Sequence, residues 1–284
     1  MFARINLATA FILALAAAAG AQSPPDQAPS SQQLEVAEPA PAQVPTAPRP
    51  QAPPAEIGAP RWTANGGFEA DSHDTGYGFA GPTYVRPFRP QMSWVAGANV
   101  NYLYYEFPSA AGGHTNVRSP GVNALGGVRF GVRNYFQLAA GPGFKRRRVE
   151  VVDPFDNVIR SSTRTKVGLH LVGVGSVDPT PHNNFYGQVA YGAEDDYIWS
   201  RAAFKEQLTN RSWSGRFTHD LGGEATVQGN DDLRSVQFGP FIELVHVPSS
   251  TAIGLRGGYK HTSYDFGPDR TGPWFAIGIW HRLR

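Results

Sequence analysis

The sequence predicts an all-β protein: an antiparallel transmembrane β-barrel of about 12 strands, preceded by a signal peptide and a disordered Pro-rich segment. Apolar and polar residues alternate along nearly every segment after residue 60, and Tyr and Trp gather near the ends of those segments. Gly, Ala, Ser, Thr and isolated charges of both signs share the polar face. Alternation alone also fits a soluble sandwich or barrel, but the other two observations favour a membrane barrel with a hydrated lumen.

The N-terminal residues predict export. Residues 1–21 combine Arg4, an apolar stretch and Ala19-Gly20-Ala21, which is the pattern of a signal peptide cleaved after Ala21; the alternative is an uncleaved membrane anchor. Residues 22–60 are rich in Pro, Ala and Gln and contain no aromatic residue, so we expect a disordered periplasmic spacer. The third segment, 61–284, is the predicted outer-membrane β-barrel. The expected location is therefore the cell outer membrane of a Gram-negative bacterium.

The strands follow from the two-residue period and from the turn residues between them. We expect strands over residues 61–70, 75–86, 92–107, 121–132, 134–147, 163–177, 184–192, 195–207, 214–229, 233–247, 250–261 and 272–283. The connections around 108–120, 148–162 and 262–271 are predicted to be long, and those at 133, 208–213 and 248–249 short. This rhythm is typical of short periplasmic turns and longer external loops, although the connection at 193–194 is shorter than it requires.

The alternation is readable strand by strand, in chain order. "LGGVRFGVR" (125–133) and "YFQLAAGPGFKRR" (135–147) each oppose an apolar face to one with Arg, Lys or Gln. "VGLHLVGVG" (167–175), "AIGLRGGYK" (252–260) and "WFAIGIWHRL" (274–283) repeat this pattern. "GGEATVQGNDDLRSVQFGPFIEL" (222–244) predicts a hairpin turning at Asn230-Asp231-Asp232. Its apolar face carries Ala225, Val227, Val236, Phe238, Ile242 and Leu244, and its polar face carries Glu224, Thr226, Gln228, Gln237 and Glu243.

Aromatic residues near the strand ends predict girdles at the two membrane interfaces. They are Trp62, Tyr84, Trp94, Tyr102, Tyr104, Tyr135, Tyr186, Tyr197, Trp199, Trp274 and Trp280. The apolar faces between these girdles should contact lipid, which makes outer-membrane lipid the expected partner of the barrel.

The predicted lumen is lined by charges of both signs. The candidate lumen-facing residues are Trp274, Trp280, Glu224, Glu243, Arg129, Arg201 and Arg256. Further charged residues predicted on the same side are Lys145, Arg147, Lys166, Lys205, Arg216, Asp220, Lys260 and Arg282. They predict either a plug of paired charges or a lumen that binds anions or sugars. We favour the plug, because small barrels are commonly filled by their own side chains.

Composition and motifs give no sign of an enzyme. The 284-residue chain has a formal net charge of +2 and no cysteine, so we expect no nucleic-acid partner, no thiol chemistry and no Cys metal site. G-x-S-x-G, HExxH and P-loop motifs are missing, and we expect no catalytic residue, cofactor or metal. The acidic segments "HDTGYG" (73–78) and "AEDDY" (193–197) suit either calcium or solvated turns, and turns are favoured. A lipid-modifying hydrolase would need a site such as Ser200 with His219, which nothing in the sequence pairs.

Four segments resemble the BcsS family of cellulose biosynthesis proteins. They are "GGFEADSHDTGYGFAGPTYVRPF", "NALGGVRFGVRNYFQLAAGPGFKRRR", "TKVGLHLVGVGSVDPTPHNNFYGQVAYGAEDDYIWSRAAF" and "LGGEATVQGNDDLRSVQFGPFI". The resemblance spans 66–284 and rests on Gly, aromatic and Arg positions. It implies an outer-membrane accessory of cellulose biosynthesis and secretion, which exports, guides or anchors the glucan. Cellulose or another β-glucan and the secretion machinery would be its partners.

The resemblance leaves the part played by the lumen open. A glucan conduit would use Trp274 and Trp280, joined by Tyr135 and Tyr105, as stacking platforms for sugar rings. The alternative functions are a general small-solute porin, a structural surface barrel and, less favoured, a lipid-modifying outer-membrane hydrolase.

Overall fold

The computed structural model describes residues 60–109, 112–180, 182–194, 196–208, 216–231, 233–264 and 268–283. These residues form twelve strands. Their bounds are β1 (Arg61–Asp71), β2 (Gly76–Arg89), β3 (Met92–Pro108), β4 (His114–Phe130), β5 (Tyr135–Val152), β6 (Val158–Val177), β7 (Asn183–Gly192), β8 (Tyr197–Gln207), β9 (Phe217–Gly229), β10 (Leu233–His246), β11 (Thr251–Tyr264) and β12 (Arg270–Leu283). Within the described ranges, no helix could cross a membrane.

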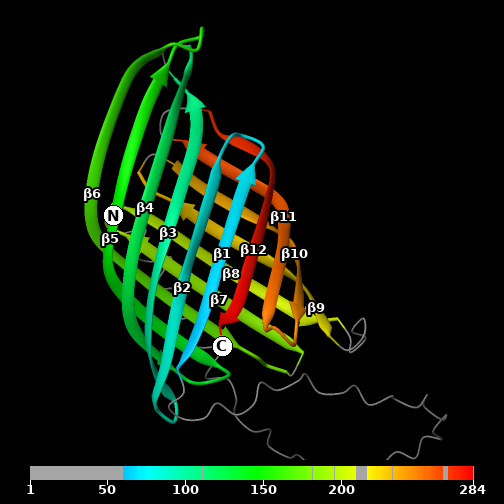
Figure 1. Cartoon of the computed structure of the whole chain (residues 1–284). Coiled ribbons are helices and arrows are strands. Elements are labelled where there is room, and N and C mark those ends of the chain that lie inside the picture. Colours follow the sequence, from blue (N-terminus) through cyan, green and yellow to red (C-terminus); the bar gives the residue numbers. More distant parts are fainter. Residues whose placement is uncertain are drawn as a thin grey trace, which may run out of the picture. The chain divides into compact units, whose positions relative to one another are not determined.

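The strands close into one antiparallel barrel, in which each strand pairs with its neighbours in sequence and β1 pairs with β12 (Figure 1). The closing ladder runs in continuous register from Trp62 opposite Leu283 to Asp71 opposite Trp274. Closure removes both sheet edges, which would otherwise expose unpaired backbone groups. The predicted all-β antiparallel barrel of about twelve strands is confirmed. The expected signal peptide and nearly all of the expected spacer, residues 1–59, lie outside the described residues.

The alternation predicted for the hairpin of residues 222–244 is confirmed. Phe238 is 62% exposed on the outer surface of the barrel, whereas Gln237 beside it is 2% exposed and faces the lumen. Val236 lies opposite Val227 on the outside, and Gln237 lies opposite Thr226 on the inside. The register therefore keeps the predicted apolar face on the outside, as a two-residue period requires. Leu233 and Phe241 are the exceptions, because they are apolar and buried on the lumen side.

The long connections predicted at 108–120 and 148–162 are wrong, because most of their residues belong to strands. β4 begins at His114, β5 continues to Val152 and β6 begins at Val158. The turn between β5 and β6 is closed by the Asp153 carboxylate, which accepts the backbone N–H groups of Phe155 (2.9 Å) and Asn157 (2.8 Å). The expected long connection at 262–271 is also shorter, since β11 reaches Tyr264 and β12 begins at Arg270.

The hairpin of β5 and β6 extends beyond its neighbour on one side. β7 has ten residues and pairs with β6 only from His170 to Val177. The first half of β6 is therefore hydrogen-bonded to β5 alone, and its side chains are exposed. In Figure 1 this hairpin, with β4 beside it, rises past the shorter hairpin of β7 and β8.

Some residues assigned to the aromatic girdles lie in the lumen instead. Trp62 packs on Tyr84 with ring centroids 4.7 Å apart, and both belong to the outer face. Trp274, by contrast, is buried inside the barrel, and Tyr135 lies under the Arg129 guanidinium. Tyr186 and Tyr197 also face inward, against Arg201 and Lys145. Proximity to a strand end does not distinguish the two faces. They are distinguished by parity, that is, by whether a residue occupies an odd or an even position along its strand.

Candidate functional site

The lumen is closed by apolar side chains at the barrel end away from Arg61 and Leu283. We call this group the apolar plug. It consists of the buried Leu103, Tyr105, Val117, Leu233 and Tyr264, with Tyr77, Phe107, Val149 and Tyr197 packed against them. The Phe107 ring lies 6.1 Å from Tyr105 and 6.0 Å from Tyr264, centroid to centroid. Tyr105 is 1% exposed, so the plug has the solvent exclusion of a protein core.

The sequence signal for the apolar plug lies in β3. "NYLYYEFP" (101–108) is apolar or aromatic at successive positions, so its two faces are both apolar. Tyr102 is exposed on the outer surface, whereas Leu103 and Tyr105 are buried inside. Tyr105 is an expected lumen residue. Leu103 is not, because strict alternation predicts polar residues inside, and Val117 is not, because it falls in the connection expected at 108–120.

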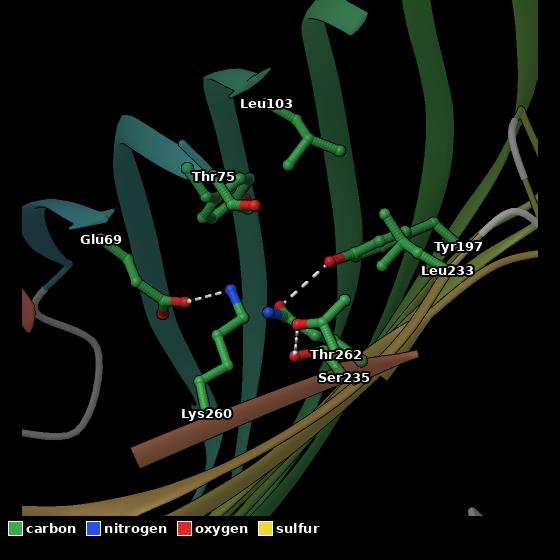
Figure 2. A pocket seen from close by; sticks show the side chains of 10 residues that line it. Glu69, Thr75, Leu103, Tyr197, Leu233, Ser235, Lys260 and Thr262 are labelled. Carbon is green, nitrogen blue, oxygen red and sulfur yellow. Dashed lines mark hydrogen bonds and ion pairs between the residues drawn. The ribbon is translucent and has the colours of Figure 1, made fainter. Parts of the chain in front are cut away.

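A layer of polar contacts lies directly under the apolar plug, around a cavity of about 10 Å³ (Figure 2). The Lys260 ammonium lies 3.0 Å from Asp71 Oδ2 and 3.5 Å from Glu69 Oε1. Gln237 Nε2 donates to Glu69 Oε2 at 3.0 Å. These contacts tie β10 and β11 to β1, across the seam where the barrel closes. The cavity has room for about one water molecule.

The middle of the lumen holds a carboxylate between two guanidinium groups. Glu224 on β9 forms ion pairs with Arg201 on β8 and with Arg256 on β11, whose Nε lies 3.3 Å from Glu224 Oε2. Arg256 reaches this position over Gly278 on β12, where an added Cβ would lie 3.4 Å from Arg256 Nη1. A glycine on the lumen face thus leaves the space that the arginine side chain occupies.

A second ion-pair layer follows toward the end of the barrel where β1 begins and β12 ends. The Lys205 ammonium lies 2.6 Å from Glu243 Oε1 and 2.9 Å from Asp220 Oδ2. Asp220 is buried, and it lies opposite Glu243 in the β9–β10 ladder. Without Lys205 these carboxylates would face each other across neighbouring strands, so the lysine provides the positive charge that two adjacent acids require.

Arg129 forms a separate contact group near the same end. Its Nε and Nη2 both donate to Gln137 Oε1, at 3.1 and 2.8 Å. Its guanidinium also lies 4.3 Å from the centre of the Tyr135 ring. The group is stabilised by hydrogen bonds and a cation–π contact rather than by an acidic partner.

The structure brings together three of the seven predicted lumen residues: Glu224, Arg201 and Arg256. Glu243 belongs to the Lys205 layer, and Arg129 lies apart. Trp274 is 4% exposed, and its Nε1 donates to the Phe238 carbonyl at 3.4 Å. Trp280, 41% exposed, lies six positions further along β12, about 20 Å away for an extended strand. The two tryptophans therefore form no continuous platform.

The acidic segments near the turns hold local hydrogen bonds. Asp71 Oδ1 accepts the backbone N–H groups of His73 at 2.9 Å and Thr75 at 3.1 Å. Glu194 lies 3.6 Å from His170 Nδ1, and Asp195 is outside the described residues. Among the residues that the structure describes, no three His, Asp or Glu side chains are placed to hold a metal ion.

One family model matches the chain: cellulose biosynthesis protein BcsS, over residues 91–283. The match covers β3 to β12 and therefore most of the apolar plug. It also covers the two ion-pair layers, which are formed around Glu224 and around Lys205. No curated protein matches the chain.

Solved structures that resemble this chain do so at low sequence identity. The β domain of the Bordetella autotransporter BrkA is 11% identical, with 80% of this chain and 99% of that chain covered and a TM-score of 0.46. LpxR from Salmonella typhimurium is 8% identical, with 77% and 99% covered and a TM-score of 0.47. The translocator domain of the autotransporter NalP from Neisseria meningitidis is 9% identical, with 80% and 89% covered and a TM-score of 0.44.

Proposed function

Because the chain belongs to the BcsS family of cellulose biosynthesis proteins, we propose that it is a non-enzymatic outer-membrane barrel that guides or anchors the secreted glucan. In this proposal the glucan does not pass through the lumen of this barrel. The observation that carries the proposal is the closed lumen, in which the apolar plug and the ion-pair layers occupy the space that a conduit would need.

The outer surface supports a place in the outer membrane. A closed barrel that exposes Phe68, Phe238 and Phe275 carries a wide apolar surface, which water-soluble monomers avoid. Along β5, each outward residue from Phe136 to Phe144 is apolar, a stretch of the length that crosses a bilayer. The expected cleaved signal peptide would deliver the chain to this membrane.

The lumen contacts support guidance or anchoring over conduction. A glucan chain would have to displace Tyr105, Val117 and the other plug residues, and it would separate Lys260 from its two carboxylates. Trp274, which could otherwise stack on a sugar ring, is buried with its N–H group on a backbone carbonyl. A steadily open small-solute porin is disfavoured for the same reasons.

A lipid-modifying hydrolase is not favoured by the positions of its candidate residues. Ser200 Oγ donates to the Val227 carbonyl at 3.2 Å, near the end of β8 that starts at Tyr197. His219 lies next to Asp220, which is opposite Gln207 at the other end of the same strand. Ser200 is thus near one end of β8, whereas His219 on β9 lies beside the other end of β8, so the two side chains cannot act as nucleophile and base.

The test is deletion of the protein from its host, followed by measurement of cellulose outside the cell and in the periplasm. We expect less cellulose at the cell surface, restored by the full-length chain. We also expect a Trp274→Ala/Trp280→Ala variant to restore surface cellulose. The matched control is Trp62→Ala/Trp94→Ala, which changes two tryptophans on the outer face. Unchanged cellulose in both places after deletion would overturn the proposal in favour of a structural surface barrel.

Conductance of the purified full-length chain in a planar bilayer separates the remaining alternatives. A closed lumen predicts no steady current. A steady open-channel current would favour the small-solute porin or the conduit. The hydrolase is tested in a separate assay, in which release of acyl chains from labelled lipopolysaccharide would favour it.

A further inference from the structure

An outward-facing group of arginines follows directly after the apolar surface of β5. We call Arg118 on β4 and Arg146 and Arg148 on β5 the arginine cluster; all three are exposed. Arg146 continues the parity of Phe144, the last apolar residue on the outer face of β5, and Arg148 is the next residue on that face. The side chains therefore lie on the lipid-facing side of the barrel, at the level where its apolar surface ends.

The strand register arranges these residues in rows. Val122, Phe144 and Val167 lie opposite one another on β4, β5 and β6 and form the last apolar row. Arg146 stands in the next row and Arg118 and Arg148 in the row after that, so positive charge replaces apolar surface over a single step of the ladder. This is the order of groups that a lipid presents, with acyl chains below a charged head group.

Arg118 and Arg148 are direct cross-strand partners, an arrangement of like charges that destabilises a sheet unless an anion lies between them. Arg148 contacts Glu150, with Nη2 2.5 Å from Oε1. Glu106, the other carboxylate on this face, accepts the Tyr104 hydroxyl at 3.2 Å. Both acids lie in the row beyond the arginines, farther from the apolar surface.

Arg118 and Arg146 therefore form no ion pair with any acid in the described part of the chain. Tyr102 lies beside them on the outer face of β3, opposite Pro120. It is an exposed aromatic residue at the boundary where such residues face lipid head groups. The surface thus combines unpaired positive charge, an interfacial tyrosine and an apolar row.

We propose that the arginine cluster binds the phosphate groups of lipopolysaccharide in the outer leaflet, with acyl chains packed on Phe144 and Val167. The planar guanidinium group donates two parallel hydrogen bonds to a phosphate, and a phosphate between Arg118 and Arg148 removes their repulsion. A glycolipid with more than one phosphate supplies an anion for Arg146 as well. This inference rests on the proposed outer-membrane location, with the barrel end where β1 begins and β12 ends on the periplasmic side, but not on a role in cellulose secretion.

The test measures the affinity of fluorescent lipopolysaccharide for the full-length chain in phosphatidylcholine vesicles. The variant is Arg118→Gln/Arg146→Gln. The control, Arg164→Gln/Lys166→Gln, removes the same charge from the opposite face of the sheet on the neighbouring strand β6, where these residues lie opposite Arg147 and Lys145. We expect the cluster variant to raise Kd by at least about tenfold, as loss of charge-assisted hydrogen bonds implies, and the control by less than about twofold.

Two further measurements identify the ligand group. Dephosphorylated lipopolysaccharide should bind the wild-type chain as weakly as the intact glycolipid binds the cluster variant, and phosphatidylglycerol should compete poorly. Equal loss in both variants, equal binding of the dephosphorylated form, or full competition by phosphatidylglycerol would overturn the proposal. The comparison of intact with dephosphorylated lipopolysaccharide uses the wild-type chain, so it tests the proposal even if the cluster variant fails to assemble.

The same variants keep this inference separate from the proposed function. Surface cellulose in a host that carries the cluster variant reports on the role in secretion, whereas the vesicle titration reports on lipid binding alone. Lost binding with normal cellulose supports this inference and leaves the secretion role to its own deletion test. Normal binding by the cluster variant overturns this inference, whatever the cellulose level.

Discussion

Replacing Glu224 by Gln should strongly destabilise the barrel, because this residue supplies the negative charge between Arg201 and Arg256. Glutamine keeps the shape of the side chain but removes its charge. The Glu224 side chain is only 3% exposed, and both arginines are mostly buried in the lumen. The substitution therefore leaves two positive groups in the lumen without their counter-charge.

The expected magnitude follows from these contacts. A hydrogen bond to a charged group contributes about 1.5–3 kcal/mol, and removing one partner of a buried ion pair costs about 3–5 kcal/mol. The arginines keep some contact with solvent, which screens their repulsion, so we expect a loss of about 3 kcal/mol in the free energy of unfolding. The control is Arg133→Gln, which removes a half-exposed ion pair with Asp178 and should cost less than about 1 kcal/mol.

The assay is urea unfolding of the full-length chain in phosphatidylcholine vesicles, followed by tryptophan fluorescence. A variant with Glu224→Leu, Arg201→Met and Arg256→Met removes the three charges together. It should recover most of the stability that Glu224→Gln loses, because no unpaired charge remains. If Glu224→Gln unfolds within about 1 kcal/mol of the wild type, the lumen is hydrated enough to screen its charges, and the reasoning is refuted.

Three further predictions concern the plug, the packing and a turn. Tyr105→Ala should open the apolar plug and give a measurable bilayer current where the wild type gives none; equal currents would contradict a closed lumen. Gly239→Val should prevent assembly, because a Cβ there would lie 2.0 Å from a carbonyl of β11, whereas Gly126→Ala meets nothing within 4 Å; gel migration with and without heating checks both. The Asn157 backbone N–H lowers the pKa of the Asp153 carboxyl in the folded chain. The turn should thus be fully stabilised above the unfolded pKa and weaken as pH falls through the folded pKa, and NMR titration of Asp153 should show a midpoint below that of an unfolded peptide.

The strand count and the two faces of most strands could be predicted from the sequence, because a two-residue period determines which side chains share a face. The β9–β10 hairpin shows this well, since every residue assigned to its apolar or polar face lies there. The strand ends at 114–120 and 148–162 could not be predicted. Val117 and Val149 belong to the apolar plug, but the polar residues around them interrupt the two-residue period. The hydrogen-bond ladder that orders these strand ends has no signature in hydrophobicity.

The partners of the lumen charges were decided by the tertiary structure. Parity places Glu224, Arg201 and Arg256 inside, but only the register of β8, β9 and β11 brings them into contact. Lys260 meets Glu69 because β12 closes on β1, a contact between distant parts of the sequence that no local pattern encodes. The sequence by itself determined a twelve-stranded barrel with a polar interior. Register and closure decided that this interior is filled, because they determine which side chains share the limited volume of the lumen.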